Sequence, residues 1–475
     1  MNRLPGPDGP GAEPGAEPDW LMARGLERPP DFPGSSPAAV LLRKRRIAAA
    51  LKPLLPQVPG ADAVRPLIGP VGGTTAWVAE QPGPAVADSW NLTVFVDPGL
   101  SMEFWRPVTD EFVHLLRRLG LCRQEVAHTF DRRSMSEWNR PPTTGGRRTQ
   151  ADGATSGPVL VLTDGLAGSW YTGVAAELLH ALGERYPVVV VHLLPEELWP
   201  STGIAARPRA VYGHVRGVQR PRAAEDAEGD MFPVPVLPLR EAPLWRWAKF
   251  LARGPGSWSH LPTVLVSAQA ARLSWPPFPG VRHSAVTAEE LVVDFGRTAS
   301  HGAGTLAAAL AAVPLNLPVM RHVQSRVVPG SAPDLLSELF IAGLLLPVVR
   351  PDEVCHHDRV TFDFPPGTRQ LLLGAAKRAG TAEVLADAAS FVEHELQVPG
   401  VERWGGLHME GERESDDPVN ARAEPFLRVQ LDVLKALSGP YSGRARALER
   451  ALEEWSRQRH EGSGQGPPAS DFAGP

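Results

Sequence analysis

The clearest hydrophobic pattern in the chain is the run LTVFV at Leu92–Val96, which is mostly apolar and rich in β-branched and aromatic residues. It ends at Asp97, and after a Pro-Gly pair and Ser101 the apolar positions recur with the 3.6-residue period of a helix. This order predicts a buried strand, a polar turn and a helix. Ligands of open α/β sheets bind beyond the carboxyl ends of the strands, so Asp97 and Ser101 are candidate functional residues.

A similar order follows further along the chain. The run VLVLTDG at Val159–Gly165 predicts a second strand, which ends at Asp164, and Trp170–Leu182 has helical spacing. The run VVVVHL at Val188–Leu193 predicts a third strand that is apolar on both faces. Alternating strands and helices with fully apolar strands indicate the α/β class, with a doubly wound, mostly parallel sheet.

The boundaries of this α/β domain are predicted at about residues 88 and 260. Within it, Val234–Leu239 is expected to be the last strand, while the charged stretch 207–229 and the polar stretch 131–158 are expected to be loops. The proline-rich stretch 261–282 is expected to be a connection.

Outside this domain the pattern is different. Residues 1–37 are rich in Pro and Gly with little apolar periodicity, which predicts a disordered tail, and residues 38–87 are expected to form a helix and an arm. Residues 285–400 have helical patterns interrupted by a short strand and a Pro-Pro-Gly turn, which predicts a mainly α-helical, winged-helix-like module. Terminal helices are expected over 420–460.

Composition excludes several classes of protein. The net charge of -5 gives no overall attraction for nucleic acid or an anionic membrane, and the two cysteines, Cys122 and Cys355, lie too far apart to suggest a disulfide scaffold. The first ten residues contain no apolar signal segment, and no apolar stretch is long enough to span a bilayer. The sequence therefore predicts a cytoplasmic protein with protein partners and with neither nucleic-acid nor membrane partners.

Common catalytic motifs are not found in the sequence. A phosphate-binding loop needs Gly-Lys beside a hydroxyl residue, and the chain contains no Gly-Lys pair. The nucleophile elbow of hydrolases, the HExxH zinc helix and paired-cysteine zinc spacings are missing as well. The cluster Cys355–Asp358, CHHD, consists of metal-ligating residue types, but adjacent residues on one loop rarely bind the same ion.

The best candidate pair is Asp97 and Asp164. The ends of two parallel strands bring two carboxylates together only if a cation or a proton reduces their repulsion. The structural alternative is that each aspartate caps the helix that follows it. Trp105 and Trp170 stand near the starts of the two following helices and are candidate partner-binding residues at a shared rim, with packing beneath neighbouring loops as the alternative.

The turn residues resemble the metal-ion-dependent adhesion site of the von Willebrand factor A family, which uses Asp-x-Ser-x-Ser, a distant Thr and an Asp-Gly after a later strand. The resemblance implies Asp97, Ser101 and Asp164 as metal ligands and Mg²⁺ as the cofactor. Gly99 replaces the first Ser of the motif. The family's Thr is not identified among the candidates Thr143, Thr144, Thr149 and Thr155. With one hydroxyl ligand missing, we expect Mg²⁺ binding to be weak or absent.

The stretches LNLPVMRHVQ, GLLLPV and FDFPPGTRQLLL resemble the region that follows such domains in bacterial signalling and conflict-system proteins, which act beside MoxR-class AAA+ or signalling ATPases. The resemblance implies a non-catalytic adaptor that binds protein partners through the strand-end face. Two alternatives remain open, a metal-dependent hydrolase that uses Asp97 and Asp164, and a winged-helix transcriptional regulator.

Overall fold

The structure is a computed structural model of the whole chain. It describes residues 37–55, 92–122, 127–138, 157–212, 231–253, 257–272, 286–348, 361–402, 419–420 and 422–463. The predicted tail and arm, the CHHD cluster and the four candidate threonines lie outside the described residues.

The described residues form two units. One, here called the α/β unit, comprises Ser35–Ser284 together with the separate segment Ala332–Ile341. The other, the C-terminal unit, contains the described parts of Ala285–Ser331 and Ala342–Pro475. The segment Ala332–Ile341 therefore belongs by sequence to the predicted helical module and by its contacts to the α/β unit.

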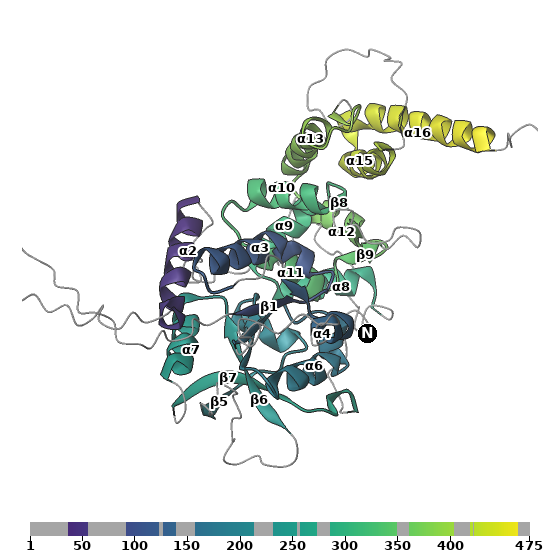
Figure 1. The fold of residues 1–475 in the computed structure, drawn as a ribbon. Helices are drawn as coiled ribbons and strands as arrows, with labels where there is room; N and C mark the ends of the chain where they lie inside the picture. The colour runs from purple at the N-terminus through teal and green to yellow at the C-terminus, as the bar shows by residue number, and fades with distance from the viewer. Residues whose placement is uncertain are drawn as a thin grey trace, which may run out of the picture. The chain divides into compact units, whose positions relative to one another are not determined.

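A seven-stranded sheet in the order β2-β1-β3-β4-β6-β7-β5 forms the centre of the α/β unit (Figure 1). Its strands are β1 (Thr93–Val96), β2 (His128–Thr129), β3 (Val159–Thr163), β4 (Val188–His192), β5 (Arg207–Tyr212), β6 (Phe232–Pro238) and β7 (Trp258–Val266). Neighbouring strands from β2 to β6 pair in parallel, and β7 pairs antiparallel with both β6 and β5. The predicted α/β class with a mostly parallel sheet is confirmed.

Helices lie between the consecutive strands β1 and β2, β2 and β3, β3 and β4, and β6 and β7. They are α3 (Met102–Arg118), α4 (Arg132–Trp138), α5 (Gly168–Tyr171), α6 (Val174–Gly183) and α7 (Glu241–Arg253). The first strand and helix follow the prediction, because β1 is buried and α3 has a strongly amphipathic pattern. The short helix α4 lies where the sequence predicted only an exposed loop.

Two strands were missed by the sequence interpretation. The stretch predicted as a charged loop begins with the edge strand β5, and the predicted proline-rich connection begins inside the nine-residue strand β7. Pro208 of β5 lies directly opposite Pro262 of β7. Two prolines can face each other at a position where the ladder requires neither N–H, so these prolines do not interrupt the pair.

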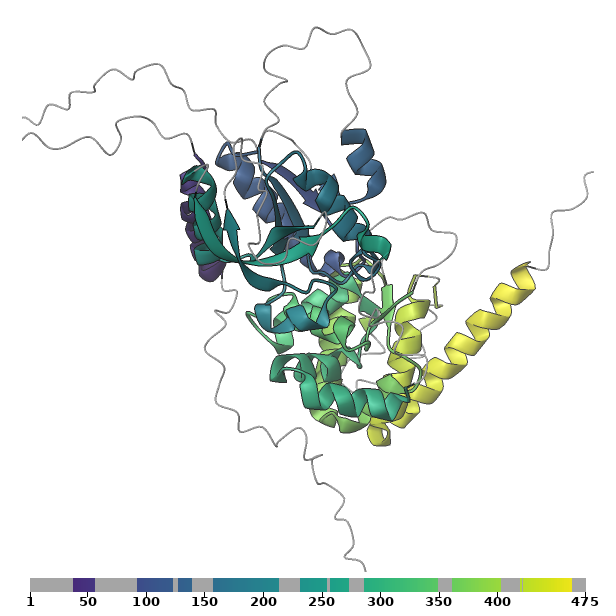
Figure 2. The ribbon, with the colours of Figure 1, turned by 90° about the horizontal axis from the view of Figure 1, so that it is seen from below.

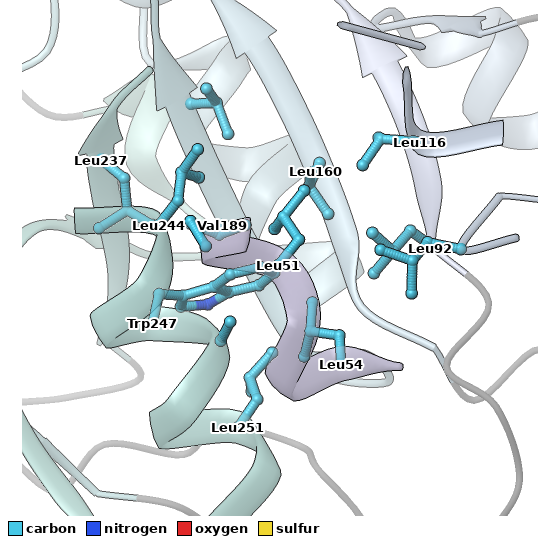
Figure 3. Packing of buried hydrophobic residues seen from close by; sticks show 14 of the residues in the cluster. Leu51, Leu54, Leu92, Leu116, Leu160, Val189, Leu237, Leu244, Trp247 and Leu251 are labelled. Atoms are coloured by element: carbon cyan, nitrogen blue, oxygen red, sulfur yellow. The ribbon is translucent and has the colours of Figure 1, made fainter. Parts of the chain in front are cut away.

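The core on one side of the sheet explains where the N-terminal helix lies. Helix α2 (Pro37–Leu51) and the following 3-10 turn place Leu51 and Leu54 against Trp247 of α7, and all three side chains are fully buried (Figure 3). Leu92 and Leu160 of the sheet region complete this part of the cluster. Burying large apolar side chains contributes roughly 1.5–3 kcal/mol each, so α2 is an integral part of the α/β unit.

The C-terminal unit contains a small antiparallel sheet in the order β8-β10-β9. Its strands are β8 (Leu315–Asn316), β9 (Leu346–Val348) and β10 (Thr361–Asp363), and its helices before residue 400 are α8 (Ala288–Thr298), α9 (His301–Leu310), α10 (Leu317–Val327), α12 (Thr368–Ala375) and α13 (Arg378–His394). Arg369 joins this sheet to the helices, since it donates to the carbonyls of Ala311 and Val313 and to Asp363.

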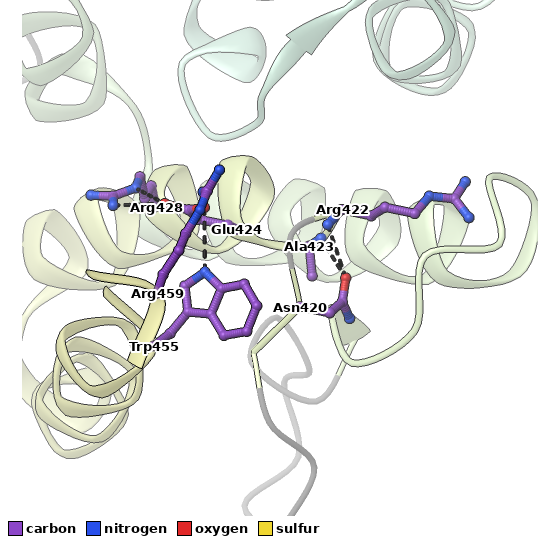
Figure 4. Close-up of polar contacts among 7 residues, drawn as sticks. All are labelled: Asn420, Arg422, Ala423, Glu424, Arg428, Trp455 and Arg459. Atoms are coloured by element: carbon purple, nitrogen blue, oxygen red, sulfur yellow. Dashed lines mark hydrogen bonds and ion pairs between the residues drawn. The ribbon is translucent and has the colours of Figure 1, made fainter. Parts of the chain in front are cut away.

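Helices α15 (Glu424–Leu437) and α16 (Ser442–Ser463) lie side by side, as the predicted terminal helices (Figure 2). Glu424 at the start of α15 is the polar centre of this hairpin (Figure 4). Its carboxylate accepts hydrogen bonds from Arg428, from Arg459 and from the indole of Trp455.

Among the described helices, none combines the length and the apolar character that crossing a membrane requires.

Candidate functional site

The candidate site lies at the carboxyl ends of β1, β3 and β4, three neighbours in the sheet. Val96 is in register with Leu162, so Asp97, one residue later, lies next to Thr163. Thr163 in turn is in register with His192. Side chains from three strand ends therefore converge where the sequence placed only two aspartates.

Asp97 is 2% exposed, and both of its carboxylate oxygens accept hydrogen bonds from the protein. Oδ1 accepts from the backbone N–H of Gly99 at 2.9 Å. Oδ2 accepts from the hydroxyl of Thr163 at 2.5 Å and from the indole N–H of Trp170 at 2.6 Å. Burial raises the pKa of Asp97, and the hydrogen bonds from Thr163, Trp170 and Gly99 oppose this rise.

Asp164 is fully buried and is bonded on one side only. Its Oδ1 accepts from the N–H of Leu166 at 3.1 Å, whereas its Oδ2 has no hydrogen-bond partner among the described residues. Burial and the charge of Asp97 raise the pKa of Asp164 to about 7. The Ser101 hydroxyl is close enough to lower this pKa in part, although no hydrogen bond of normal geometry from Ser101 Oγ is found within the described residues.

The helix-capping alternative does not describe these aspartates. Asp97 and Asp164 each accept from the backbone N–H two residues later, which makes both of them turn residues before a helix rather than helix caps. The residue that precedes α3 is Ser101, and its side chain makes no capping hydrogen bond.

His192 is a buried member of the site that the sequence interpretation missed. Its Nδ1 accepts a hydrogen bond from the N–H of Leu194 at 3.3 Å, and its ring stacks on Trp199 with centroids 5.0 Å apart. Burial lowers the pKa of His192 to about 3, so the ring is neutral near neutral pH. Because Nδ1 is the acceptor, the proton is assigned to Nε2, which has no partner among the described residues.

The three implied ligands do not form a suitable shell for Mg²⁺, which requires six oxygens in near-octahedral geometry. Asp97 is already bonded by three protein donors, and Gly99 has no hydroxyl to offer. Of the three implied ligands, Asp164 and Ser101 each keep one oxygen, Oδ2 and Oγ, without a partner among the described residues. No cluster of three or more His, Cys, Asp or Glu suited to a metal ion occurs among the residues that the structure describes.

Position 99 is also crowded for the hydroxyl residue of the adhesion motif. A Cβ built on Gly99 would lie 3.0 Å from the Cβ of Ala167, which immediately precedes α5. That separation is tighter than ordinary van der Waals contact, so a serine at position 99 would require Ala167 to move. The segment around α5 therefore supplies both the indole that bonds Asp97 and the side chain that crowds position 99.

Trp105 and Trp170 were candidate partner-binding residues at a shared rim, with packing beneath neighbouring loops as the alternative, and the structure buries both. Their side chains are 5% and 2% exposed. Trp170 stacks on Phe130, with ring centroids 5.9 Å apart, and donates to Asp97. Trp105 donates from its indole N–H to the hydroxyl of Ser337 at 3.0 Å. Each indole is thus bonded within the α/β unit, and binding of a separate partner by these two residues stays a prediction.

Ser337 belongs to helix α11 (Asp334–Ile341), the segment of the predicted helical module that belongs to the α/β unit. Ser337 and Leu339 are fully buried, and Phe340 packs edge-on against Phe104 with ring centroids 6.2 Å apart. Phe104 and Trp105 both lie in the first turn of α3, directly after the Asp97 turn. The first turn of α3 thus packs against α11, a short helix that lies more than 200 residues later in the chain.

Three site residues were missed, namely Thr163, His192 and Ser337. Thr163 directly precedes Asp164, and correct alignment of the two parallel strands would place it beside Asp97. His192 ends an apolar strand, where a buried neutral ring looks like any other strand residue. Ser337 could not be found, because nothing local to α11 indicates that it faces Trp105.

Comparisons with protein-family models, with curated protein sequences and with solved structures found no match to this chain.

Proposed function

We propose that the protein is a non-catalytic adaptor whose α/β unit binds short helices at the start of α3. The observation that carries this proposal is the contact of α11 with Phe104 and Trp105. It combines aromatic packing with one buried side-chain hydrogen bond, which is the usual chemistry of helix recognition in a groove.

The surface of α11 supports this role. None of its eight residues is exposed, and Leu335, Leu336, Ser337 and Leu339 are buried. A tryptophan that bonds a buried hydroxyl gives a specific contact, because replacing the serine would leave the indole N–H unsatisfied. We propose that a protein partner presents a helix of the same kind, and the resemblance noted in the sequence points to AAA+ or signalling ATPases as its source.

The hydrolase alternative receives less support. A metal-dependent hydrolase needs an ion that activates water, and the implied ligands do not form a shell for it. Asp97 and Asp164 are buried at 2% and 0% exposure and lie in a site where three donors bond Asp97. Such residues are better suited to fixing the turns than to contacting a substrate.

A labelled helical peptide that spans Ala332–Ala342 tests the proposal by fluorescence anisotropy on the full-length protein. In Ser337→Arg the internal helix should leave the α3 site, because an arginine does not fit against Trp105, and the peptide should bind at least about tenfold more tightly than it binds wild type. Adding Trp105→Ala should reverse this gain. Ser325→Arg, at an exposed serine of α10, is the matched control.

Equal peptide binding by wild type and Ser337→Arg would contradict helix recognition at α3. Peptide binding that survives Trp105→Ala would place the contact elsewhere. Thermal melts of each variant separate a lost contact from a lost fold.

The order of elements in the C-terminal half favours a second candidate, the winged-helix regulator. The sequence of elements α9-β8-α10-α11-β9-β10, with sheet order β8-β10-β9, is the order of a winged helix in which α11 would be the third helix. In DNA-binding proteins with a helix-turn-helix, the recognition helix enters the major groove. Here α11 carries Asp334 and Glu338 and no basic residue.

Charge argues against DNA as the ligand of this module. Residues 285–400 contain eight Arg and Lys against 13 Asp and Glu, a net charge of -5. Duplex DNA requires the opposite sign, because phosphate neutralisation supplies most of the non-specific affinity. A mobility-shift assay of the full chain at about 50 mM salt, a generous condition, should show no sub-micromolar complex. A complex that weakens steeply with added salt would instead favour the regulator.

A further inference from the structure

The carboxylate of Asp97 is buried, and the groups that bond it must offset the cost of removing it from water. A charge at 2% exposure is costly unless it is paired or fully hydrogen-bonded. The adhesion site that the sequence resembles would supply a divalent cation nearby. Among the described residues, Asp97 instead accepts hydrogen bonds from one hydroxyl, one backbone N–H and one indole N–H.

We infer that Trp170 takes the place of the cation. The turn after β1 then holds the carboxylate of Asp97 through protein hydrogen bonds, without a metal. The indole N–H is the positive end of a fixed dipole, and it lies 2.6 Å from Oδ2. Hydrogen bonds to an ionised acceptor are short and about twice as strong as neutral ones, so this contact can offset much of the cost of burying the carboxylate.

The position of the indole is fixed from several sides. Gly203 approaches the backbone and Cβ of Trp170 so closely that a Cβ at position 203 would lie 2.6 Å from the Cβ of Trp170 and 2.8 Å from its carbonyl carbon. The N–H of Gly203 bonds the carbonyl of Gly165 at 3.0 Å, which holds this approach in place. Phe130 stacks on the ring at an interplanar angle of 25°. Only a residue without a side chain leaves room for Trp170 here.

The segment that contains Trp170 also opposes the hydroxyl residue that the adhesion motif has at position 99. Trp170 bonds Asp97 Oδ2, and Ala167, three residues earlier, crowds the Cβ position of Gly99. A cation at this turn would need the indole to leave and a hydroxyl to appear at position 99. Both departures from the adhesion motif therefore have one structural cause, the path of the chain from Asp164 to Tyr171.

Melting temperatures of the full chain, with and without millimolar Mg²⁺ or Mn²⁺, test the inference. Trp170→Phe removes the N–H and keeps most of the ring. Trp247→Phe is the matched control, because Trp247 is equally buried and its N–H has no partner among the described residues. We expect Trp170→Phe to melt several degrees lower than Trp247→Phe, and wild type to show no shift with either ion.

A second variant tests the replacement itself. Combining Trp170→Phe with Gly99→Ser and Ala167→Gly frees the carboxylate, restores the hydroxyl and makes room for it. We expect this variant to gain a rise in melting temperature with Mn²⁺ that Asp97→Asn abolishes. A metal-dependent rise in wild type that Asp97→Asn removes would overturn the inference. Equal melting of Trp170→Phe and Trp247→Phe, or a folded triple variant without any metal response, would overturn it as well.

Discussion

Among the described residues, two carboxylates accept a hydrogen bond from a tryptophan, and their pKa values shift in opposite directions. Asp97 in the α/β unit receives the indole of Trp170 at 2.6 Å, and its pKa is raised. Glu424 in the C-terminal unit receives the indole of Trp455 at 3.4 Å, and its pKa is lowered, chiefly by Arg428 (Figure 4). The tryptophan contact is of the same type in both sites, and the surrounding groups decide whether the pKa of the carboxylate rises or falls.

The difference lies in the charge and exposure of the other partners. All three donors to Asp97 are neutral and the carboxylate is buried, so burial outweighs the hydrogen bonds and raises its pKa. Glu424 is held by Arg428 and Arg459, whose side chains are 59% and 67% exposed, so two cations act on it close to solvent. The first arrangement fixes two strand ends to each other, whereas the second joins two helices at the surface.

The largest expected effect is the loss of the buried acceptor. Asp97→Ala leaves the Thr163 hydroxyl, the Trp170 indole and the Gly99 N–H without their partner in a buried site, and each unsatisfied group costs about 1–3 kcal/mol. We expect urea unfolding of the full chain to show a loss of at least about 3 kcal/mol in the α/β transition. A loss below about 1 kcal/mol would mean that the three donors find water instead.

The sequence predicts those parts of this site that depend on contacts between neighbouring residues. The pattern of apolar runs predicts β1, β3, β4 and α3, because each is decided by a few neighbouring residues. The sequence does not show that Asp97 lies beside Thr163 in the sheet, one residue before Asp164. No local pattern could show this, because register is decided by the pairing of whole strands.

The other features that the sequence did not predict depend on tertiary contacts. The edge strand β5 and strand β7 contain prolines that suggest loops, and their pairing tolerates those prolines because they face each other. The sequence left a rim and a packing role open for the tryptophans, because Trp170 bonds a residue 73 positions earlier and Trp105 one 232 positions later. Such contacts depend on the complete fold rather than on any segment.

The second prediction uses pH to distinguish the two kinds of carboxylate. Asp164 has a pKa of about 7 in the folded protein against an ordinary value of 3.8, so the folded state binds the extra proton between these values. The free energy of unfolding should therefore fall as pH rises from about 4 to about 7, by up to roughly 1.4 kcal/mol per pH unit. Asp164→Asn should remove this fall.

Other buried groups also titrate in this range, so the quantity to measure is the difference between the stability profiles of wild type and Asp164→Asn. Neutral His192, with a pKa of about 3, contributes a slope of the opposite sign below its ordinary value of 6.5, because its unfolded form takes up the proton. Asp97, with a raised pKa, adds to the slope of Asp164. Subtracting the Asp164→Asn profile cancels both to first order. Parallel profiles for wild type and variant would show that Asp164 is not the buried neutral acid described here.

The smallest expected effect is at Glu424. Glu424→Gln removes the charge that Arg428 and Arg459 share and keeps an acceptor for Trp455. Ion pairs with exposed partners contribute about 1 kcal/mol or less, so thermal melts should shift slightly, and the shift should shrink in high salt because the pair is screened. Glu454→Gln, at an exposed position of the same hairpin, is the control. A salt-independent loss as large as that of Asp97→Ala would show that Glu424 also acts as a buried joint, and the contrast between the two carboxylates would fail.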